Sequence, residues 1–240
     1  MSNRWVPRFA TDRPRDAVLG RERAMDPLIV YDGEMPGKPK SRKEIILDRA
    51  EQHFADHGFQ GASLSAIARD CNVGNPGLLH HFRSKEVLYR AVLEKQAEDL
   101  STRMSKRVRP ARSPKERLQA FVELHVEWMH VRPTGFKLVT RELLDNSERI
   151  QLAQTRPLEG FLHDSVALLS DAQSAGLIRR DIQPVVVLTI ILGTLNYAKI
   201  VRPTFSKAFL EPALESDTRW MKDVARGVLR VVSSGDISQA

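Results

Sequence analysis

Apolar side chains recur every three or four residues along most of this chain, which is the spacing of one face of an α-helix. The first such face comprises Ile46, Leu47, Ala50 and Phe54, with polar residues between them. It predicts a helix over residues 41–57. Gly58 follows directly, and glycine readily adopts the left-handed conformation that ends a helix.

A short second helix is predicted after Ser63. This serine is a good N-cap because its hydroxyl can accept a hydrogen bond from an early backbone N–H. The apolar positions behind it are Leu64, Ile67, Ala68 and Cys71. The next three residues, Asn-Val-Gly at 72–74, predict a tight turn, since asparagine and glycine tolerate unusual backbone angles.

The third helix is predicted over residues 76–82. Asn75 can cap it, and Pro76 suits its first position because the missing N–H would be unpaired there. Leu78 and Phe82 lie four residues apart and anchor this helix to the two before it. The residues left on its outer side are Gly77, His80 and His81. Two short helices joined by a tight turn are a device for placing one helix in a DNA major groove.

The rest of the chain predicts further helices, so we expect an all-α fold. Ser84 caps the first of them, and Gly176 with Pro184 brackets a loop. The predicted helices span residues 85–108, 114–131, 134–144, 147–174, 184–201 and 217–232. Breaks are expected at Pro110, Pro114, Pro203 and Pro212.

The most apolar run of the chain, residues 185–195, is too short to span a bilayer before Asn196 and Lys199 intervene. It predicts a buried helix, and we expect no membrane contact. Residues 1–40 show little periodicity and are rich in Pro, Gly and Arg, which predicts a mostly disordered basic arm.

Residues 41–90 resemble the DNA-binding domain of the tetracycline-repressor (TetR) family over about 50 of the 240 residues, without a gap. The resemblance implies a helix-turn-helix domain over residues 41–90. It also implies a larger helical domain for ligand binding and dimerisation over residues 91–240, whose last two helices pair across a two-fold axis. The matching positions are Ile46, Leu47, Ala50, Phe54, Gly58, Phe59, Ser63, Ile67, Ala68, Val73, Leu78, His80, His81, Phe82, Ser84, Lys85 and Glu86.

Three positions depart from the family pattern, which usually has Ser or Thr at Gly74, Gly at Pro76 and Tyr at Leu79. Leu79 cannot donate a hydrogen bond, and it contacts a thymine methyl or simply packs. The positions that the resemblance assigns to DNA contact are Ser63, Gly74, Asn75, Pro76, Gly77, Leu79, His80, His81 and Lys85.

Charge adds support for an anionic partner. The formal net charge is +7, which favours nucleic acid. Residues 101–117 hold seven Lys or Arg against Glu116 alone, and this cluster is either a solvated helix end or a DNA-facing patch. The single cysteine, Cys71, fits a reducing cytoplasm and a buried position.

A ligand pocket in the second domain is expected to be mostly apolar with a few polar side chains that orient the ligand. Its candidate residues are His125, Trp128, Met129, Phe161, Thr189, Asn196 and Tyr197, with Phe121, Leu143 and Leu162 as further lining. Most of these are equally good plain core residues. Adjacent His80 and His81 point about 100° apart, and His125 and His130 do not share a face, so neither pair predicts a metal site.

The sequence therefore predicts a homodimeric transcriptional regulator, a repressor by family resemblance, that an unknown small-molecule effector releases from a palindromic operator in double-stranded DNA. The alternative is an architectural or partner-binding DNA-binding protein of the same fold without a small ligand. No cofactor is expected. An enzyme is disfavoured, because the chain shows no nucleophile elbow, phosphate loop, metal-ligand spacing or dinucleotide fingerprint.

Overall fold

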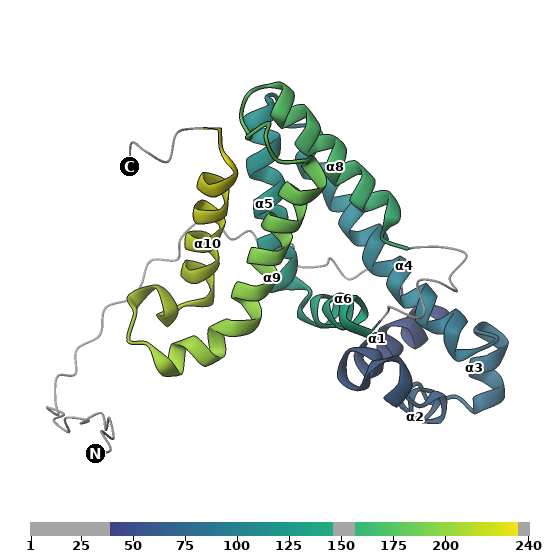
Figure 1. The fold of residues 1–240 in the computed structure, drawn as a ribbon. Helices are drawn as coiled ribbons and strands as arrows, with labels where there is room; N and C mark the ends of the chain where they lie inside the picture. Colours follow the sequence, from purple (N-terminus) through teal and green to yellow (C-terminus); the bar gives the residue numbers. More distant parts are fainter. Residues whose placement is uncertain (1–38, 146–156, 235–240) are drawn as a thin grey trace, which may run out of the picture. The chain divides into compact units, whose positions relative to one another are not determined.

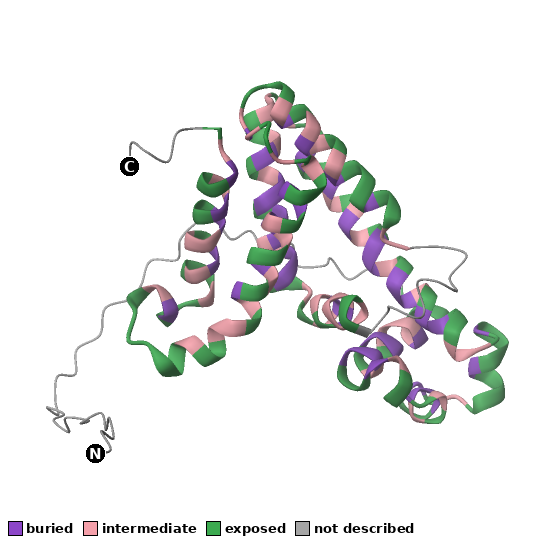
Figure 2. Cartoon of the chain, in the orientation of Figure 1, coloured by how far each residue is buried: buried purple, intermediate pink, exposed green. Residues whose placement is uncertain are grey.

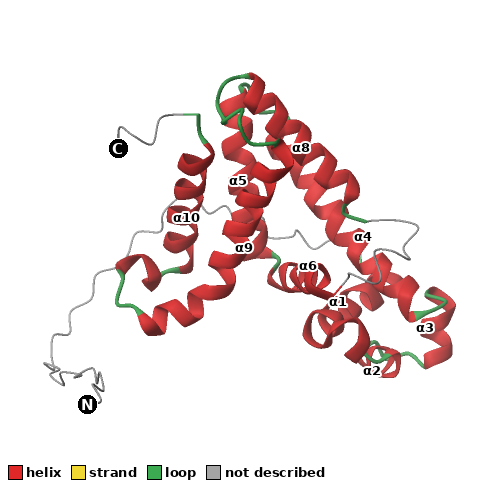
Figure 3. Cartoon of the chain, in the orientation of Figure 1, coloured by secondary structure: helices red, strands yellow, loops and turns green. Residues whose placement is uncertain are grey.

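Helices make up the regular structure of the part of the chain that the computed structural model describes, residues 39–145 and 157–234 (Figures 1 and 3). One isolated antiparallel bridge joins Ile178 to Ser233. The predicted arm, residues 1–40, falls almost wholly outside the described residues. So does the first part of the helix predicted over residues 147–174.

The observed elements follow the predicted order closely. They are α1 (Arg42–Gly61), α2 (Leu64–Asp70), α3 (Asn75–His81), α4 (Lys85–Arg103), a π-helical turn η1 (Met104–Val108), α5 (Pro114–Val131), α6 (Pro133–Asp145), α8 (Glu159–Ser174), α9 (Pro184–Ala208), a 3₁₀ turn η2 (Pro212–Glu215) and α10 (Asp217–Val232).

The start and the end of α1 show why its boundaries were predictable. Ser41 and Glu44 form a capping box, in which each side chain bonds to the backbone of the other residue. Gly58 has φ +70°, so the chain kinks there before one last turn. A side chain at this position would be strained in the left-handed conformation.

The end of α9 corrects one prediction. Pro203 was expected to end the helix, but α9 continues through it to Ala208. A proline inside a helix removes a backbone hydrogen bond, and tertiary contacts on either side of Pro203 hold this part of α9 in place. Arg202 donates from Nη2 to the Leu214 carbonyl at 2.8 Å, and the Phe205 ring lies 6.4 Å from the ring of Trp220 in α10.

Two hydrophobic cores organise the described helices. The first core is formed by α1, α2, α3 and the first half of α4, and the second is formed by the end of α4 with α5, α8, α9 and α10. Helix α6 joins the two: Leu138 is fully buried in the first core, while Phe136 and Val139 pack against the second. Gly135 lets α6 approach α4 closely, because a Cβ there would clash with the Gln96 side chain.

Within this chain the apolar helix α9 is buried on one side only (Figure 2), so the predicted burial holds for that side alone. Val187, Ile191 and Leu195 face the core, whereas Tyr197 and Ile200 are more than half exposed. By length and composition alone, α9 is the one described helix able to cross a membrane. Core helices of soluble proteins have the same length and composition.

Candidate nucleic-acid interface and effector region

The turn between α2 and α3 forms where its residues predict it, but of the two residues expected to take unusual angles only Asn72 does so; Gly74 has φ −75°, which any residue adopts. The Ser63 hydroxyl accepts from the Ala66 N–H at 3.4 Å and caps α2. Asn72 has φ +54°, a left-handed angle that asparagine tolerates better than most residues. Leu78 is fully buried beneath α3 and fixes the side of that helix that faces the core.

The outer surface of α3 is open. Pro76, Gly77, His80 and His81 are exposed, and 40% of the surface of Leu79 is exposed. The His80 and His81 ring centroids lie 5.6 Å apart with the rings at 70°. This surface presents two imidazole rings, which can hydrogen-bond to base edges or phosphates. It also presents one apolar side chain, which can contact a thymine methyl group.

Asn75 has a different role from the predicted cap. Gly74 is the N-cap residue of α3 and provides no side-chain cap, while Asn75 is the first residue of the helix. The Asn75 amide donates from Nδ2 to the Ser65 hydroxyl at 2.9 Å. Asn75 therefore ties the start of α3 to α2.

Lys85 lies at the start of α4 and makes two contacts within the protein. Its Nζ donates to the Gln60 carbonyl at 3.0 Å and lies 4.9 Å from the centre of the Phe59 ring. These contacts hold the end of α1 against the start of α4. An ammonium group has three N–H donors, so the bond to Gln60 leaves donors on Lys85 for a DNA phosphate. That contact with DNA stays a prediction.

Four of the predicted effector residues lie in the second core. Trp128, Met129 and Phe161 are buried there with His125, which is 5% exposed. The His125 ring lies 4.5 Å from the Phe121 ring and 5.6 Å from the Phe161 ring. His125, Phe121 and Phe161 form an aromatic cluster between α5 and α8, while the Trp128 indole donates to Asp99 of α4 at 3.0 Å.

His125 is the polar member of this cluster. Its Nδ1 donates to the Phe121 carbonyl at 2.8 Å, and its buried Nε2 has no hydrogen-bond partner among the described residues. Burial lowers the pKa of His125 to about 4, from an ordinary value of 6.5. The imidazole is therefore neutral near pH 7, and Nε2 is an acceptor.

The other three predicted effector residues lie elsewhere. Thr189 and Tyr197 are on the exposed side of α9, and Asn196 is half-buried. The structure does not bring them together with His125. A surface hollow of about 440 Å³ lies at the C-terminal end of α8 and contains none of the predicted residues; it is lined by Ser170, Gln173, Ser174 and Arg180.

The basic cluster at residues 101–117 lies at the C-terminal end of α4, whereas α3 adjoins its N-terminal end. The 19 residues of α4 separate the two by about 28 Å at 1.5 Å per residue. Part of the cluster is neutralised: Arg107 pairs with Glu127, and Arg109 pairs with Asp164 at 2.7 Å. The structure therefore favours the solvated helix end over the DNA-facing patch.

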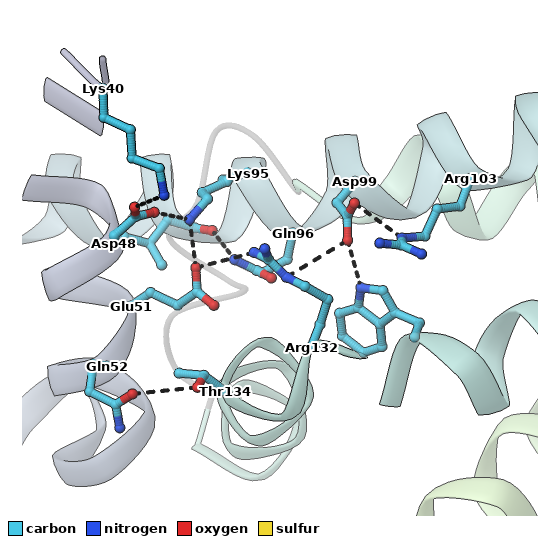
Figure 4. A network of polar contacts seen from close by, with 12 residues as sticks. Lys40, Asp48, Glu51, Gln52, Lys95, Gln96, Asp99, Arg103, Arg132 and Thr134 are labelled. Atoms are coloured by element: carbon cyan, nitrogen blue, oxygen red, sulfur yellow. Dashed lines mark hydrogen bonds and ion pairs between the residues drawn. The ribbon is translucent and has the colours of Figure 1, made fainter. Parts of the chain in front are cut away.

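A polar network that sequence patterns did not reveal joins the helix-turn-helix to α4 and α5 (Figure 4). It contains Asp48 and Glu51 of α1, Lys95 and Asp99 of α4, and Arg132 after α5. The one sequence feature that points to this network is Lys95, a charged residue among the apolar residues on the inner face of α4. Its partners lie more than 40 positions away, beyond the reach of helical periodicity.

Family models match both parts of the chain. The model described as bacterial regulatory proteins, tetR family, matches residues 46–92. The model of the tetracyclin repressor-like C-terminal domain matches residues 111–199. Together these segments cover more than half of the chain.

Individual relatives agree with the family models. The activator FasR of Mycolicibacterium smegmatis is 31% identical over 98 residues, covering 41% of this chain and 45% of FasR. The regulator RutR of Escherichia coli strain K12 is 29% identical over 136 residues, covering 57% of this chain and 64% of RutR. The matched region thus spans about half to under two thirds of these relatives.

The fold is also similar to solved structures. The crystal structure of AibR in complex with isovaleryl coenzyme A and operator DNA has a TM-score of 0.59 and 21% identity, covering 82% of this chain and all of AibR. The helix-turn-helix with its exposed third helix, the two-core helical fold and the two family models lead to one assignment. This protein belongs to the TetR family of bacterial transcriptional regulators.

Proposed function

We propose that this protein is a homodimeric repressor that leaves a palindromic operator when a small effector binds its C-terminal domain. The observation that carries the proposal is the open outer surface of α3, whose opposite side is anchored to the core by the fully buried Leu78. A short helix presented in this way fits a major groove. The protein would act in the cytoplasm, where its DNA target lies.

The proposed DNA contacts divide into two kinds. His80, His81 and Leu79 are exposed on α3, and in the proposed complex they contact base edges or phosphates. The backbone N–H groups near Gly74 and Gly77 are open to an approaching phosphate, because neither residue carries a side chain. Ser63, Asn75, Pro76 and Lys85 complete the proposed surface.

Dimerisation is supported by an open face on the last two helices. On α9, Val186, Gly193, Tyr197 and Ile200 are exposed at helical spacing. On α10, Gly227 and Val231 are exposed in the same manner, and a Cβ at Gly193 or Gly227 would meet nothing within 4 Å. Burying such a face against a second copy removes apolar surface from water.

Effector binding is assigned to the cluster around His125. Trp128, Met129, Phe161 and Phe121 supply apolar surface, and His125 Nε2 supplies an unpaired acceptor. The AibR complex with isovaleryl coenzyme A and operator DNA supports an effector-responsive mechanism for a protein of this fold. Release requires that the effector bind the DNA-free conformation more tightly than the DNA-bound one.

The test is genome-wide binding of the purified protein to fragmented host DNA, read by sequencing at moderate salt. We expect a sharp palindromic motif beside a few genes. Diffuse binding without a motif would contradict the proposal, and would favour an architectural or partner-binding protein. A screen of the motif-bound protein for compounds that release it then tests the effector.

A further inference from the structure

The helix-turn-helix is attached to the rest of the described chain by two routes. Helix α4 is continuous with it and contributes to both cores. A helix that connects two cores also allows them to tilt about it unless side contacts prevent the tilt. The second route, which supplies such contacts, consists of α6 and the polar network at the end of α5.

Arg132 is the member of that network that connects α1 and α4 to the end of α5 (Figure 4). Its Nη2 donates to Glu51 Oε2 of α1 at 3.5 Å, and its Nε lies 3.9 Å from Asp99 Oδ2 of α4. Arg132 is the C-cap residue of α5 and directly precedes α6. One guanidinium therefore lies between a carboxylate of the DNA-binding core and a carboxylate of the connecting helix.

Both carboxylates are held by other groups. Glu51 has a side chain only 8% exposed and also accepts from Lys95 Nζ at 2.8 Å. Asp99 accepts from Trp128 Nε1 at 3.0 Å and from Arg103 Nε at 3.1 Å. Because a guanidinium is planar and its donors point in fixed directions, it restricts the angle between two carboxylates more than a flexible ammonium does.

The orientation of α1 determines the orientation of α3. Ile46 and Phe54 of α1 are fully buried in one core with Ile67 of α2 and Leu78 of α3, and close-packed cores move as units. A rotation of α1 about α4 therefore carries α3 with it. In a dimer, such a rotation changes the distance between the two recognition helices.

We propose that Arg132 determines the operator spacing that this protein accepts, by fixing the angle of the helix-turn-helix through Glu51 and Asp99. It would be a specificity-determining positioning residue that touches no DNA. The inference rests on the proposed function as a dimer on two half-sites. It concerns the gap between half-sites and not the bases within each one.

The experiment begins with selection of bound sequences from random double-stranded DNA by the full-length protein. The selected operator is then rebuilt with the two half-sites moved one or two base pairs closer or further apart. Affinity for each spacing is measured for wild type, Arg132→Met, Arg132→Lys and Glu51→Gln. Arg109→Met is the matched control, because it removes a similar ion pair, with Asp164 of α8, outside the DNA-binding core.

Wild type should prefer one spacing. In Arg132→Met the preference should fall by at least about fivefold, the lower end of typical coupling between sites, with the half-site sequence unchanged. Arg132→Lys, which keeps the positive charge, should retain more of the spacing preference than Arg132→Met does. Arg109→Met should behave as wild type. Loss of folded protein alone would lower affinity for every spacing equally, so the ratio between spacings separates positioning from stability.

An unchanged spacing preference in Arg132→Met, at equal melting temperature, would overturn the inference and leave the proposed function intact. If Arg132→Met does not fold, the spacing preference of Glu51→Gln is measured in its place, and an unchanged preference would again overturn the inference. Glutamine keeps the shape of the Glu51 side chain and removes its negative charge. A wild-type selection without two half-sites would overturn the proposed function, and the inference with it.

Discussion

At the scale of single residues, helix caps and left-handed turns depend on groups close by in the chain, whereas the hydrogen-bond partners of polar side chains depend on how helices pack. Ser63 and Ser84 cap their helices as expected, and Gly58 takes the left-handed angle. These roles depend on groups within a few residues. The amide of Asn75 instead bonds to Ser65, a partner that becomes available only once two helices pack together.

His125 should make stability dependent on pH. Its folded-state pKa of about 4 lies below the ordinary 6.5, so below pH 6.5 the unfolded state takes up a proton that the folded state excludes. This contribution is fully present above pH 6.5 and is lost as the pH falls toward 4. From pH 7.5 to pH 5 it should lower the free energy of unfolding by about 2 kcal/mol.

The measurement is denaturant unfolding of wild type and His125→Leu at pH 7.5 and pH 5. The variant should lose this part of the pH dependence. Its stability at pH 7.5 should not fall greatly, because an unpaired buried acceptor has been removed. His163→Leu, at an exposed histidine of α8, is the control. Equal pH dependence in wild type and His125→Leu would contradict the burial argument.

His80 should contribute to DNA affinity and not to folding. The side chain is exposed on α3, so His80→Ala removes a hydrogen bond to DNA worth roughly 0.5–1.5 kcal/mol and leaves the melting temperature unchanged. Operator affinity by fluorescence anisotropy should fall by about two- to tenfold. His163→Ala should leave affinity unchanged, and an unaltered affinity in His80→Ala would exclude His80 from the interface.

At the scale of elements, α6 belongs to two cores at once. Periodicity predicted a helix over residues 134–144, and the structure has Pro133–Asp145. It did not indicate that Leu138 enters the core of the helix-turn-helix, while Phe136 and Val139 pack elsewhere. Periodicity identifies an apolar face but not the partner of that face.

Leu138→Ala should destabilise the DNA-binding core although Leu138 lies far from it in sequence. A fully buried leucine truncated to alanine typically costs about 2–5 kcal/mol in free energy of unfolding. Chemical denaturation measures the loss. Leu144→Ala, at a position 79% exposed, is the matched control and should change stability by less than about 0.5 kcal/mol. A small effect at Leu138 would mean that α6 is not integral to that core.

At the scale of the whole molecule, the open faces of α9 and α10 predict assembly. Thr189 and Tyr197, first considered for an effector pocket, lie on this exposed side of α9. Their polar groups are as suitable for the rim of an interface as for a ligand. The face was not apparent from composition, because α9 is apolar nearly all round.

Ile200→Asp should convert a dimer to monomers. The side chain is 53% exposed on α9, and a charge there would be buried without a partner in the proposed interface. Sedimentation velocity should show a dimer for wild type and for Val87→Asp, a control on an exposed apolar residue of α4. A dimeric Ile200→Asp protein that retains operator binding would place the interface elsewhere.

The sequence by itself determined most of the helices, the caps at Ser63 and Ser84 and the apolar side that holds α3 on its core, because these depend on interactions within a few residues and on one-sided apolar patterns. Only the tertiary structure decided which helices share a core, which faces stay open and which charges meet. The ion pairs of Arg132 with Glu51 and Asp99 join positions far apart in the chain. Such contacts depend on packing in three dimensions, and helical periodicity carries no information about them.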